Sequence, residues 1–461
     1  MKNISFYLVT DPHYYDSAFR RTGKAYEERS ITDQKCVAET PAIIDAGFAQ
    51  IAKDKETDII LIPGDLVYRG EYQSHVGFRE RLYKLKAQGK KIYLITARHD
   101  YCEDGEPVEF EDDKLLPVKG MPRAALRDFY KDFGFADAFS EHRESMSYVA
   151  QLSDGVRLLA LNCDGDCKDF KGIWANQMAW ALEQIKEAHE AGQYIFAMTH
   201  YPLLPFSPIM NLIGDAHLTD WEQTAQTLAD AGLDLIFTGH MHAQAVTEYT
   251  TEKGNTITDV QTGCFVGCPC AYRKVTLTEH TAEIQSYTVQ DFEYDKQGKT
   301  AKEYFEWRFN RMIDWKMDEI LPKPAKKLLD KFTLKKLGRL LWFKVDKSVE
   351  DRLAKDVGIE LVRNIFIGNE PYVKGTPIYE AMSKLLKRLH PVTHILEKKM
   401  GAKNPVLSNI DTFILSMIGD EKQRDYDTVL KINQHAEKEK GYVCKNGGSA
   451  DSAGQKACEK R

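Results

Sequence analysis

Short apolar runs alternate with longer amphipathic segments over residues 1–292. The apolar runs predict strands at residues 4–10, 58–62, 91–96, 156–161, 194–199 and 234–238. Between them, apolar residues recur at i, i+3 and i+4, which predicts helices at residues 36–54, 72–89, 124–133, 174–191 and 219–232. This alternation of strand and helix is typical of an α/β layered domain.

A second group of strand patterns follows without helices between them. Residues 245–250, 256–261, 273–278 and 283–289 carry Thr, Val, Ile and Tyr at close spacing, which predicts an antiparallel continuation of the sheet structure. Two sheets packed face to face would accommodate both halves of this region.

The pattern changes again after residue 292. Lys, Leu, Glu and Trp recur there with helical periodicity, and prolines interrupt the pattern at Pro322, Pro324, Pro371 and Pro391. We therefore expect a helical C-terminal region over residues 293–440. Residues 441–461 are small and polar with little to bury, which predicts a disordered tail.

Composition narrows the class of protein. With 461 residues, 43% of them hydrophobic, the chain can bury sizeable cores. Its net charge of −6 provides no global attraction to nucleic acid, so nucleic acid is not an expected partner. Nine cysteines in a chain of this length do not indicate a disulfide framework, and we expect reduced thiols.

The N-terminal sequence enters a strand pattern directly, without the basic and apolar regions of a signal peptide. No stretch reaches about 18 uninterrupted apolar residues, so no transmembrane helix is expected. Together with the reduced cysteines, these features favour a cytoplasmic location. The sequence leaves the oligomeric state open.

Five of the predicted strands end in residues of similar chemistry. The carboxyl ends of strands in an α/β sheet line one edge, where ligands bind, so these side chains should converge. Carboxylates and imidazoles are ligands for Zn, Mn, Fe or similar divalent ions, and two ions can be held if one carboxylate bridges them. In chain order the residues are Asp11, His13, Asp65, His99, Asp100, His200, His240 and His242.

A single histidine after a strand is more often a capped or solvated residue than a ligand. Five strand ends with the same chemistry are hard to explain in that way. Gly64 precedes Asp65 and Gly239 precedes His240, and glycine permits the tight turns that direct the next side chain into a site. The sequence therefore predicts a metal centre.

The ordered motifs Asp11-Pro12-His13, Gly64-Asp65, His99-Asp100, His200 and Gly239-His240-Met241-His242 resemble those of the calcineurin-like metallophosphoesterases, written D-x-H, G-D, G-N-H-[DE], H and G-H-x-H. The resemblance covers residues 1–292. It implies a four-layer α/β/β/α sandwich. It also implies one metal held by Asp11, His13 and His242, a second held by His200 and His240, and Asp65 bridging the two.

The same resemblance implies hydrolysis of a small phosphate mono- or diester. Two cations lower the pKa of a bridging water and neutralise phosphate charge. His99 would then donate a proton to the leaving oxygen, with Asp100 orienting it, and general acid assistance of this kind contributes about 10²–10⁴-fold.

Arg98 departs from the family pattern, which places a metal-ligating asparagine there. Arginine has no available lone pair and stays charged, so the second metal site should be weaker. Three interpretations remain open. Arg98 binds the substrate phosphate; it turns outward beside one tight and one loose metal; or the site is crippled and the protein is a catalytically weak metal- or phosphate-binding scaffold.

Three weaker signals complete the picture. Asn162 and Asp164 follow a strand at the same sheet edge and are candidate substrate contacts, although an ordinary turn explains them equally well. Tyr68 could be a metal ligand, but a packing role is favoured. Residues 323–344 combine lysines with Leu and Trp, which is typical of an interfacial membrane helix, whereas a helix packed on the catalytic domain with a solvated lysine face is the favoured alternative.

Overall fold

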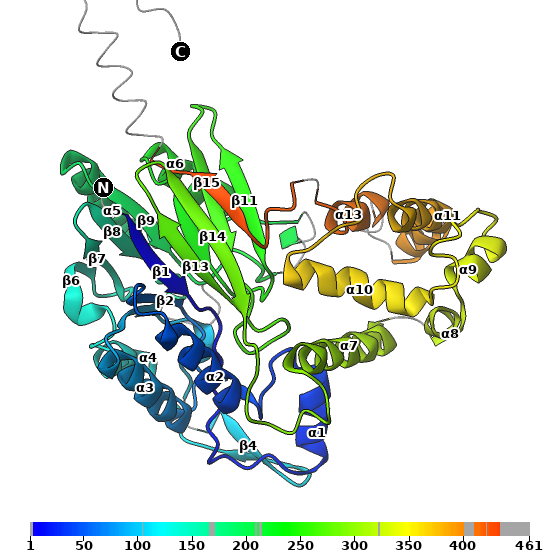
Figure 1. Cartoon of the computed structure of the whole chain (residues 1–461), viewed down its shortest axis with the longest axis horizontal. Coiled ribbons are helices and arrows are strands. Elements are labelled where there is room, and N and C mark those ends of the chain that lie inside the picture. Colours follow the sequence, from blue (N-terminus) through cyan, green and yellow to red (C-terminus); the bar gives the residue numbers. More distant parts are fainter. Residues whose placement is uncertain are drawn as a thin grey trace, which may run out of the picture.

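Two β-sheets face each other, with helices on their outer faces and a helical arm extending to one side (Figure 1). The computed structural model describes residues 3–103, 105–165, 171–207, 210–211, 214–320, 323–400, 410–420 and 422–433. The predicted four-layer α/β/β/α sandwich with a helical C-terminal region is confirmed.

The first sheet has six strands in the order β15-β14-β13-β1-β2-β3. Its parallel part is formed by β1 (Ile4–Leu8), β2 (Ile59–Pro63) and β3 (Lys91–Ile95). Its antiparallel part is formed by β13 (Ala271–Leu277), β14 (Thr281–Thr288) and β15 (Thr428–Lys431).

The second sheet has seven strands in the order β11-β12-β10-β9-β8-β7-β6. Its parallel centre comprises β8 (Val156–Ala160), β9 (Tyr194–Met198), β10 (Leu235–Thr238) and β12 (Thr256–Gln261). Antiparallel strands complete its two edges: β6 (Ala138–His142), β7 (Ser147–Ser153) and β11 (Ala245–Thr250).

Aromatic side chains join the two sheets. Phe6 of β1 stacks on Phe196 of β9 with ring centroids 5.3 Å apart, and it meets the edge of Phe237 of β10 at 5.4 Å. All three residues are buried. Because aromatic pairs of this size bury large apolar areas, they fix the two sheets face to face. The carboxyl ends of both parallel parts therefore meet along one edge of the sandwich.

Helices cover the outer faces of the sandwich, and they lie at the positions that their apolar stripes predicted. The first sheet carries α2 (Thr40–Lys53), α3 (Tyr72–Ala87) and α4 (Arg123–Phe129). The second carries α5 (Ala175–Glu190) and α6 (Trp221–Asp230). Helix α1 (Gly23–Thr32) was not predicted, because it buries no side chain fully and lacks an apolar stripe.

The structure differs from the sequence prediction in its shorter strands. The four strand patterns after residue 245 divide between the sheets, with β11 and β12 in the second and β13 and β14 in the first. Strands β6 and β7 and the hairpin of β4 (Val108–Glu111) and β5 (Lys114–Pro117) were not predicted. Short strands such as β4 and β5 have too few residues for a clear alternation.

The C-terminal region consists mainly of α7 (Ala301–Ile320), α8 (Lys323–Lys331), α9 (Leu334–Leu340), α10 (Ala354–Ile367), α11 (Pro377–Met400) and α13 (Ile410–Met417). A small core of its own includes Leu334, Leu337 and Leu361. Strand β15 follows these helices and pairs with β14 of the first sheet. A domain boundary at residue 292 stays a prediction, and the predicted tail at 441–461 lies outside the described residues.

Residues 323–344 form two short helices rather than one continuous interfacial helix. Leu334 and Leu337 point into the small core, and Leu328, Leu329 and Phe332 pack against it. Most of the segment is therefore packed, but within the helical region itself rather than on the catalytic domain, as the favoured alternative had it. Within the described part of the chain, no helix is long and apolar enough to cross a membrane.

Candidate metal centre

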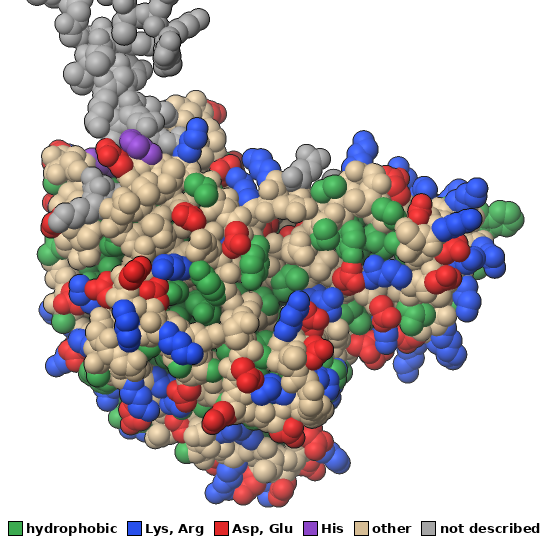
Figure 2. Space-filling view, in the orientation of Figure 1, with side chains coloured by type: hydrophobic (Ala, Val, Ile, Leu, Met, Phe, Trp, Pro, Cys, Tyr) green, Lys and Arg blue, Asp and Glu red, His purple; other side chains and the backbone are tan. Residues whose placement is uncertain are grey.

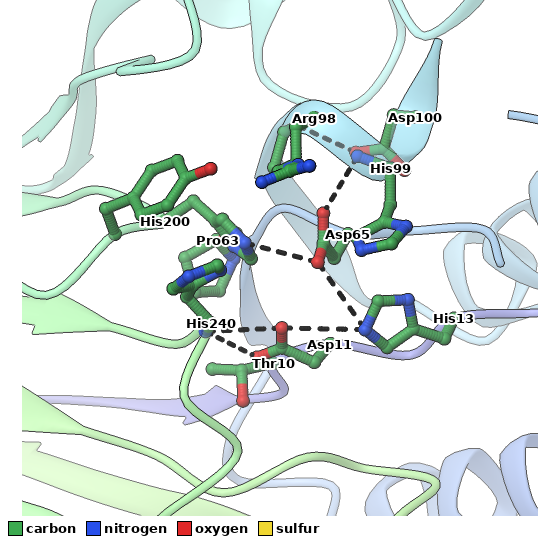
Figure 3. Close-up of polar contacts among 12 residues, drawn as sticks. Thr10, Asp11, His13, Pro63, Asp65, Arg98, His99, Asp100, His200 and His240 are labelled. Atoms are coloured by element: carbon green, nitrogen blue, oxygen red, sulfur yellow. Dashed lines mark hydrogen bonds and ion pairs between the residues drawn. The ribbon is translucent and has the colours of Figure 1, made fainter. Parts of the chain in front are cut away.

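The predicted ligands converge at the edge where the carboxyl ends of the strands meet (Figure 3). Five of the six have a backbone φ in the left-handed region: Asp11 at 52°, His13 at 40°, Asp65 at 51°, His240 at 69° and His242 at 59°. Such φ values are uncommon for residues other than glycine, and strained backbone of this kind concentrates at functional sites.

The two glycines of the predicted motifs are required by this geometry. Gly64 has a φ of 92°, which most other residues avoid. A Cβ atom at Gly239 would lie 2.5 Å from Oδ2 of Asp11, so only glycine lets the backbone pass this carboxylate. The amide of His240 then donates to Oδ1 and Oδ2 of Asp11 at 3.2 and 3.1 Å.

The ligands form two groups, each with its donor atoms within 4.8 Å of one another: Asp11, His13, Asp65 and His242 in the first, and Asp65, His200 and His240 in the second. Asp65 belongs to both. Its Oδ2 lies 3.5 Å from Nε2 of His13 and 3.2 Å from Nε2 of His200. In Figure 3 this carboxylate lies between His13 on one side and His200 on the other.

Hydrogen bonds in the first group determine which imidazole nitrogens are free. Nδ1 of His13 faces the carbonyl oxygen of Val67 at 3.4 Å, and Nδ1 of His242 faces Oε1 of Gln34 at 2.9 Å. Both oxygens can only accept, so each Nδ1 donates and each neutral ring keeps its lone pair on Nε2. The two Nε2 atoms are 3.1 Å apart.

Asp11 Oδ1 lies 3.4 Å from Nε2 of His242. Two lone-pair nitrogens and two carboxylates therefore face one another, and a cation is the group that satisfies such a set of acceptors.

The second group follows the same rule. Nδ1 of His200 donates to the carbonyl oxygen of Pro63 at 2.9 Å, and Nε2 of His240 donates to the carbonyl oxygen of Asp215 at 2.5 Å. The lone pairs then lie on Nε2 of His200 and Nδ1 of His240. Nε2 of His200 is buried and faces Oδ2 of Asp65. Metal-binding histidines are commonly oriented by such bonds from the other ring nitrogen.

The electrostatics of the site favour a positive ion. Burial opposes the charge on Asp65, but His200, His99 and His13 overcome it and hold its pKa well below the ordinary value. Burial also opposes a charge on His200, yet Asp65 and Asp11 raise the pKa of that imidazole to about 9. The carboxylates that attract a proton to His200 would equally attract a divalent cation.

The turn at residues 98–100 forms the rim of the site. Arg98 is turned toward the loop after β9, where its Nη1 contacts Oδ2 of Asp215 at 2.5 Å, and its side chain is 34% exposed. It is therefore neither inside the metal centre nor free in solvent. The pKa of Arg98 is raised: burial would lower it, but Tyr201, Asp215 and Asp65 outweigh that effect.

His99 and Asp100 lie on the same turn but make different contacts. The ring of His99 meets His13 edge-on with centroids 5.1 Å apart, and its backbone amide donates to Oδ1 of Asp65 at 3.2 Å. Asp100 accepts from the amides of Val67 and Ala97 at 3.1 and 2.8 Å, rather than from the imidazole of His99 that it was expected to orient. A carboxylate in this position fixes the turn itself.

The candidate substrate contacts at the end of β8 are buried. Asn162 donates from Nδ2 to Thr96 and accepts from the amide of Asp164, so its side chain is engaged within the protein. Burial raises the pKa of Asp164 to about 7, and its Oδ1 lies 3.6 Å from Arg123. Tyr68 donates to Asp33 at 2.7 Å and packs in an aromatic cluster, which agrees with the favoured packing role.

Sequence reasoning missed two residues that orient the ligands. Gln34 lies in the connection between α1 and α2, and Asp215 lies in the loop between β9 and α6. Neither residue can be recognised as an orienting residue from its neighbours in the sequence, because an isolated polar residue in a loop is common. The six described cysteines, Cys36, Cys102, Cys163, Cys264, Cys268 and Cys270, are free and buried.

Comparison with known proteins identifies a family. The model of the calcineurin-like phosphoesterase family matches residues 4–244, and a search of curated proteins found no match. A dimetal phosphatase from Danio rerio is similar in structure, with 11% identity, a TM-score of 0.45, and coverage of 62% of this chain and 96% of that chain.

Two further solved structures resemble this chain at a TM-score of 0.38. A purple acid phosphatase from yellow lupin seeds has 14% identity, with 62% of this chain and 52% of that chain covered. A putative 5′-nucleotidase from Staphylococcus aureus has 12% identity, with 78% and 72% covered. Since the family match spans more than half of the sequence, this chain belongs to the calcineurin-like phosphoesterases, metal-dependent hydrolases of phosphate ester bonds.

Proposed function

We propose that this protein hydrolyses a small phosphate mono- or diester with two divalent cations. Asp11, His13 and His242 would hold the first, His200 and His240 the second, and Asp65 both. The observation that carries the proposal is the convergence of acceptors on both sides of Asp65. The cations would supply a hydroxide at neutral pH and neutralise phosphate charge.

His99 is proposed as the general acid. It lies on the rim next to His13, where it can reach the leaving oxygen of a substrate seated on the metal centre. Burial lowers its pKa to about 3, so it needs a partner that favours the protonated form. The negative phosphate of the substrate provides such a partner, because an opposite charge at contact distance favours the imidazolium.

Arg98 is proposed to bind the substrate phosphate. Its guanidinium is positioned at the rim by Asp215, and phosphate is a bidentate partner that can replace that carboxylate. The alternative is a catalytically weak metal- or phosphate-binding protein, and the specific observation that favours it is that an arginine occupies the position of a ligand asparagine. Metal analysis of the purified protein, together with hydrolysis of a mono- and a diester, would identify the metals and the substrate class. Substitution of Asn162 or Asp164 would show whether either residue contacts the substrate.

The Asp65→Asn variant tests the shared carboxylate. Metal content per chain should fall at both positions, and hydrolysis of chromogenic mono- and diesters should fall by about a hundredfold or more, since charge stabilisation by the ions contributes several kcal/mol. Asp45→Asn, on the exposed face of α2, serves as the matched control and should leave both unchanged. Full metal content with normal turnover in Asp65→Asn would rule out the two-metal mechanism.

A further inference from the structure

The far end of the helical arm exposes an aromatic and an aliphatic side chain together. Trp342, in the turn after α9, is 85% exposed, and Leu340 at the end of α9 is 50% exposed. Trp342 is the most exposed large hydrophobic residue in the described part of the chain. Figure 2 shows hydrophobic side chains projecting among Lys and Arg at the right-hand end of this arm.

This exposure is not a failure of the region to pack. Leu334 and Leu337, from the same helix, are buried in the small core. The backbone oxygen of Trp342 accepts from Arg388 of α11 at 3.3 Å, and that of Lys344 accepts from Lys384 at 3.4 Å. The turn is therefore attached to α11 through its backbone, while the indole ring is left outside.

Unneutralised positive charge surrounds the two side chains. Lys336, Arg339, Lys344 and Lys387 are exposed and have no acidic partner among the described residues. Two other lysines of the same segment are paired: Lys335 with Glu350 at 2.6 Å and Lys326 with Asp330 at 2.9 Å. Asp346, two residues after Lys344, accepts from the amide and the hydroxyl of Ser348 at 2.9 and 2.6 Å. The concentration of positive charge contrasts with the net charge of −6 of the whole chain.

We infer that this tip, formed by Leu340, Trp342 and the surrounding Lys336, Arg339, Lys344 and Lys387, binds the surface of a membrane that contains anionic lipid. Trp belongs at the boundary between headgroups and acyl chains, and Leu340 inserts beside it. The cations meet the lipid phosphates. Nucleic acid fits less well, because a projecting aliphatic side chain has no partner on a phosphate backbone. This inference does not depend on the proposed catalysis.

Cosedimentation of the full chain with lipid vesicles tests the inference. Binding is expected to vesicles of phosphatidylcholine with phosphatidylserine, to be much weaker with phosphatidylcholine alone, and to weaken as salt is added. Arg339→Ser combined with Lys344→Ser should weaken binding about 25-fold, since each cation near an anionic surface contributes about fivefold. Trp342→Ala should weaken it about tenfold.

A matched control lies on the β4-β5 hairpin, where Lys114 and Leu115 are exposed side by side. Lys114→Ala with Leu115→Ala should bind vesicles as the unchanged protein does. All variants should keep the thermal unfolding temperature and the hydrolytic activity. Absence of binding to anionic vesicles at low salt, equal binding to both lipid mixtures, or complete displacement from vesicles by a short oligonucleotide would each overturn the inference.

Discussion

Arg98 is the residue at which this chain departs from its family. An amide there would supply an oxygen ligand, whereas the guanidinium supplies only donors and a charge. The structure turns that charge toward Asp215 at the rim. The same Asp215 accepts from His240 through its backbone oxygen, so one loop residue contacts both the unusual side chain and a candidate metal ligand.

Replacing Arg98 by Asn distinguishes two hypotheses: that Arg98 binds the substrate phosphate, and that Arg98 impairs the second metal site. If Arg98 binds substrate, the variant should raise KM by about tenfold, which corresponds to about 1.4 kcal/mol and lies within the range for hydrogen bonds to charged groups. Its affinity for the second metal should rise, because the amide oxygen is restored. Steady-state kinetics with a metal titration measure both effects.

Asp215→Asn is the matched control for this experiment. It removes the carboxylate that holds Arg98 but keeps the backbone oxygen that accepts from His240. KM should then stay unchanged or fall, since Arg98 is released for the substrate. A large rise in kcat with unchanged KM in Arg98→Asn would instead show that the natural site is crippled.

At the scale of elements, the connections between helices and strands complete the metal centre. The strands deliver the ligands, but their orientation depends on partners in loops that the hydrophobic pattern does not describe. The connection between α1 and α2 carries Gln34 to His242, and Asp33 of the same connection accepts from Tyr68. This one connection, which is far from the motifs in the sequence, is thereby attached to the site.

Gln34→Ala should lower the affinity of the first metal position by about 10- to 100-fold, because His242 loses the acceptor that fixes its ring and tautomer. Equilibrium titration with a divalent ion measures this loss. Gln34→Glu keeps an acceptor at the same place and should restore most of the affinity. Equal affinity in the alanine variant would mean that the Gln34 contact does not orient His242.

At the scale of the whole molecule, a buried arginine joins the sandwich to the segment that returns from the helical arm. Arg273 of β13 donates to the backbone oxygens of Gln261, Asp425 and Tyr426 at 2.9, 2.7 and 2.9 Å. Burial lowers its pKa to about 10, yet the group remains charged at neutral pH. This guanidinium holds the segment leading into β15 together with two backbone amides, those of Val246 and Ser286, which donate to Asp425 and Asp427 at 2.6 Å each.

Arg273→Met should therefore lower the free energy of unfolding by about 3 kcal/mol or more, since it leaves several buried carbonyl groups without donors. Denaturation in urea measures the change, and Arg273→Lys should recover only part of it because the fork of donors is lost. Arg339→Met, at an exposed position, is the control and should stay within about 0.5 kcal/mol. A similarly small effect at Arg273 would contradict this role.

The sequence by itself determined the layered fold, the family and the strand ends at which the candidate ligands lie. These features follow from local periodicity and from motifs, and both can be read over a few residues. Only the tertiary structure decided which sheet received each strand from β11 to β15, because pairing joins segments far apart along the chain. It also decided the pairing of Arg98 with Asp215 and of His242 with Gln34, since a side chain selects its partner among whatever residues the fold brings within reach.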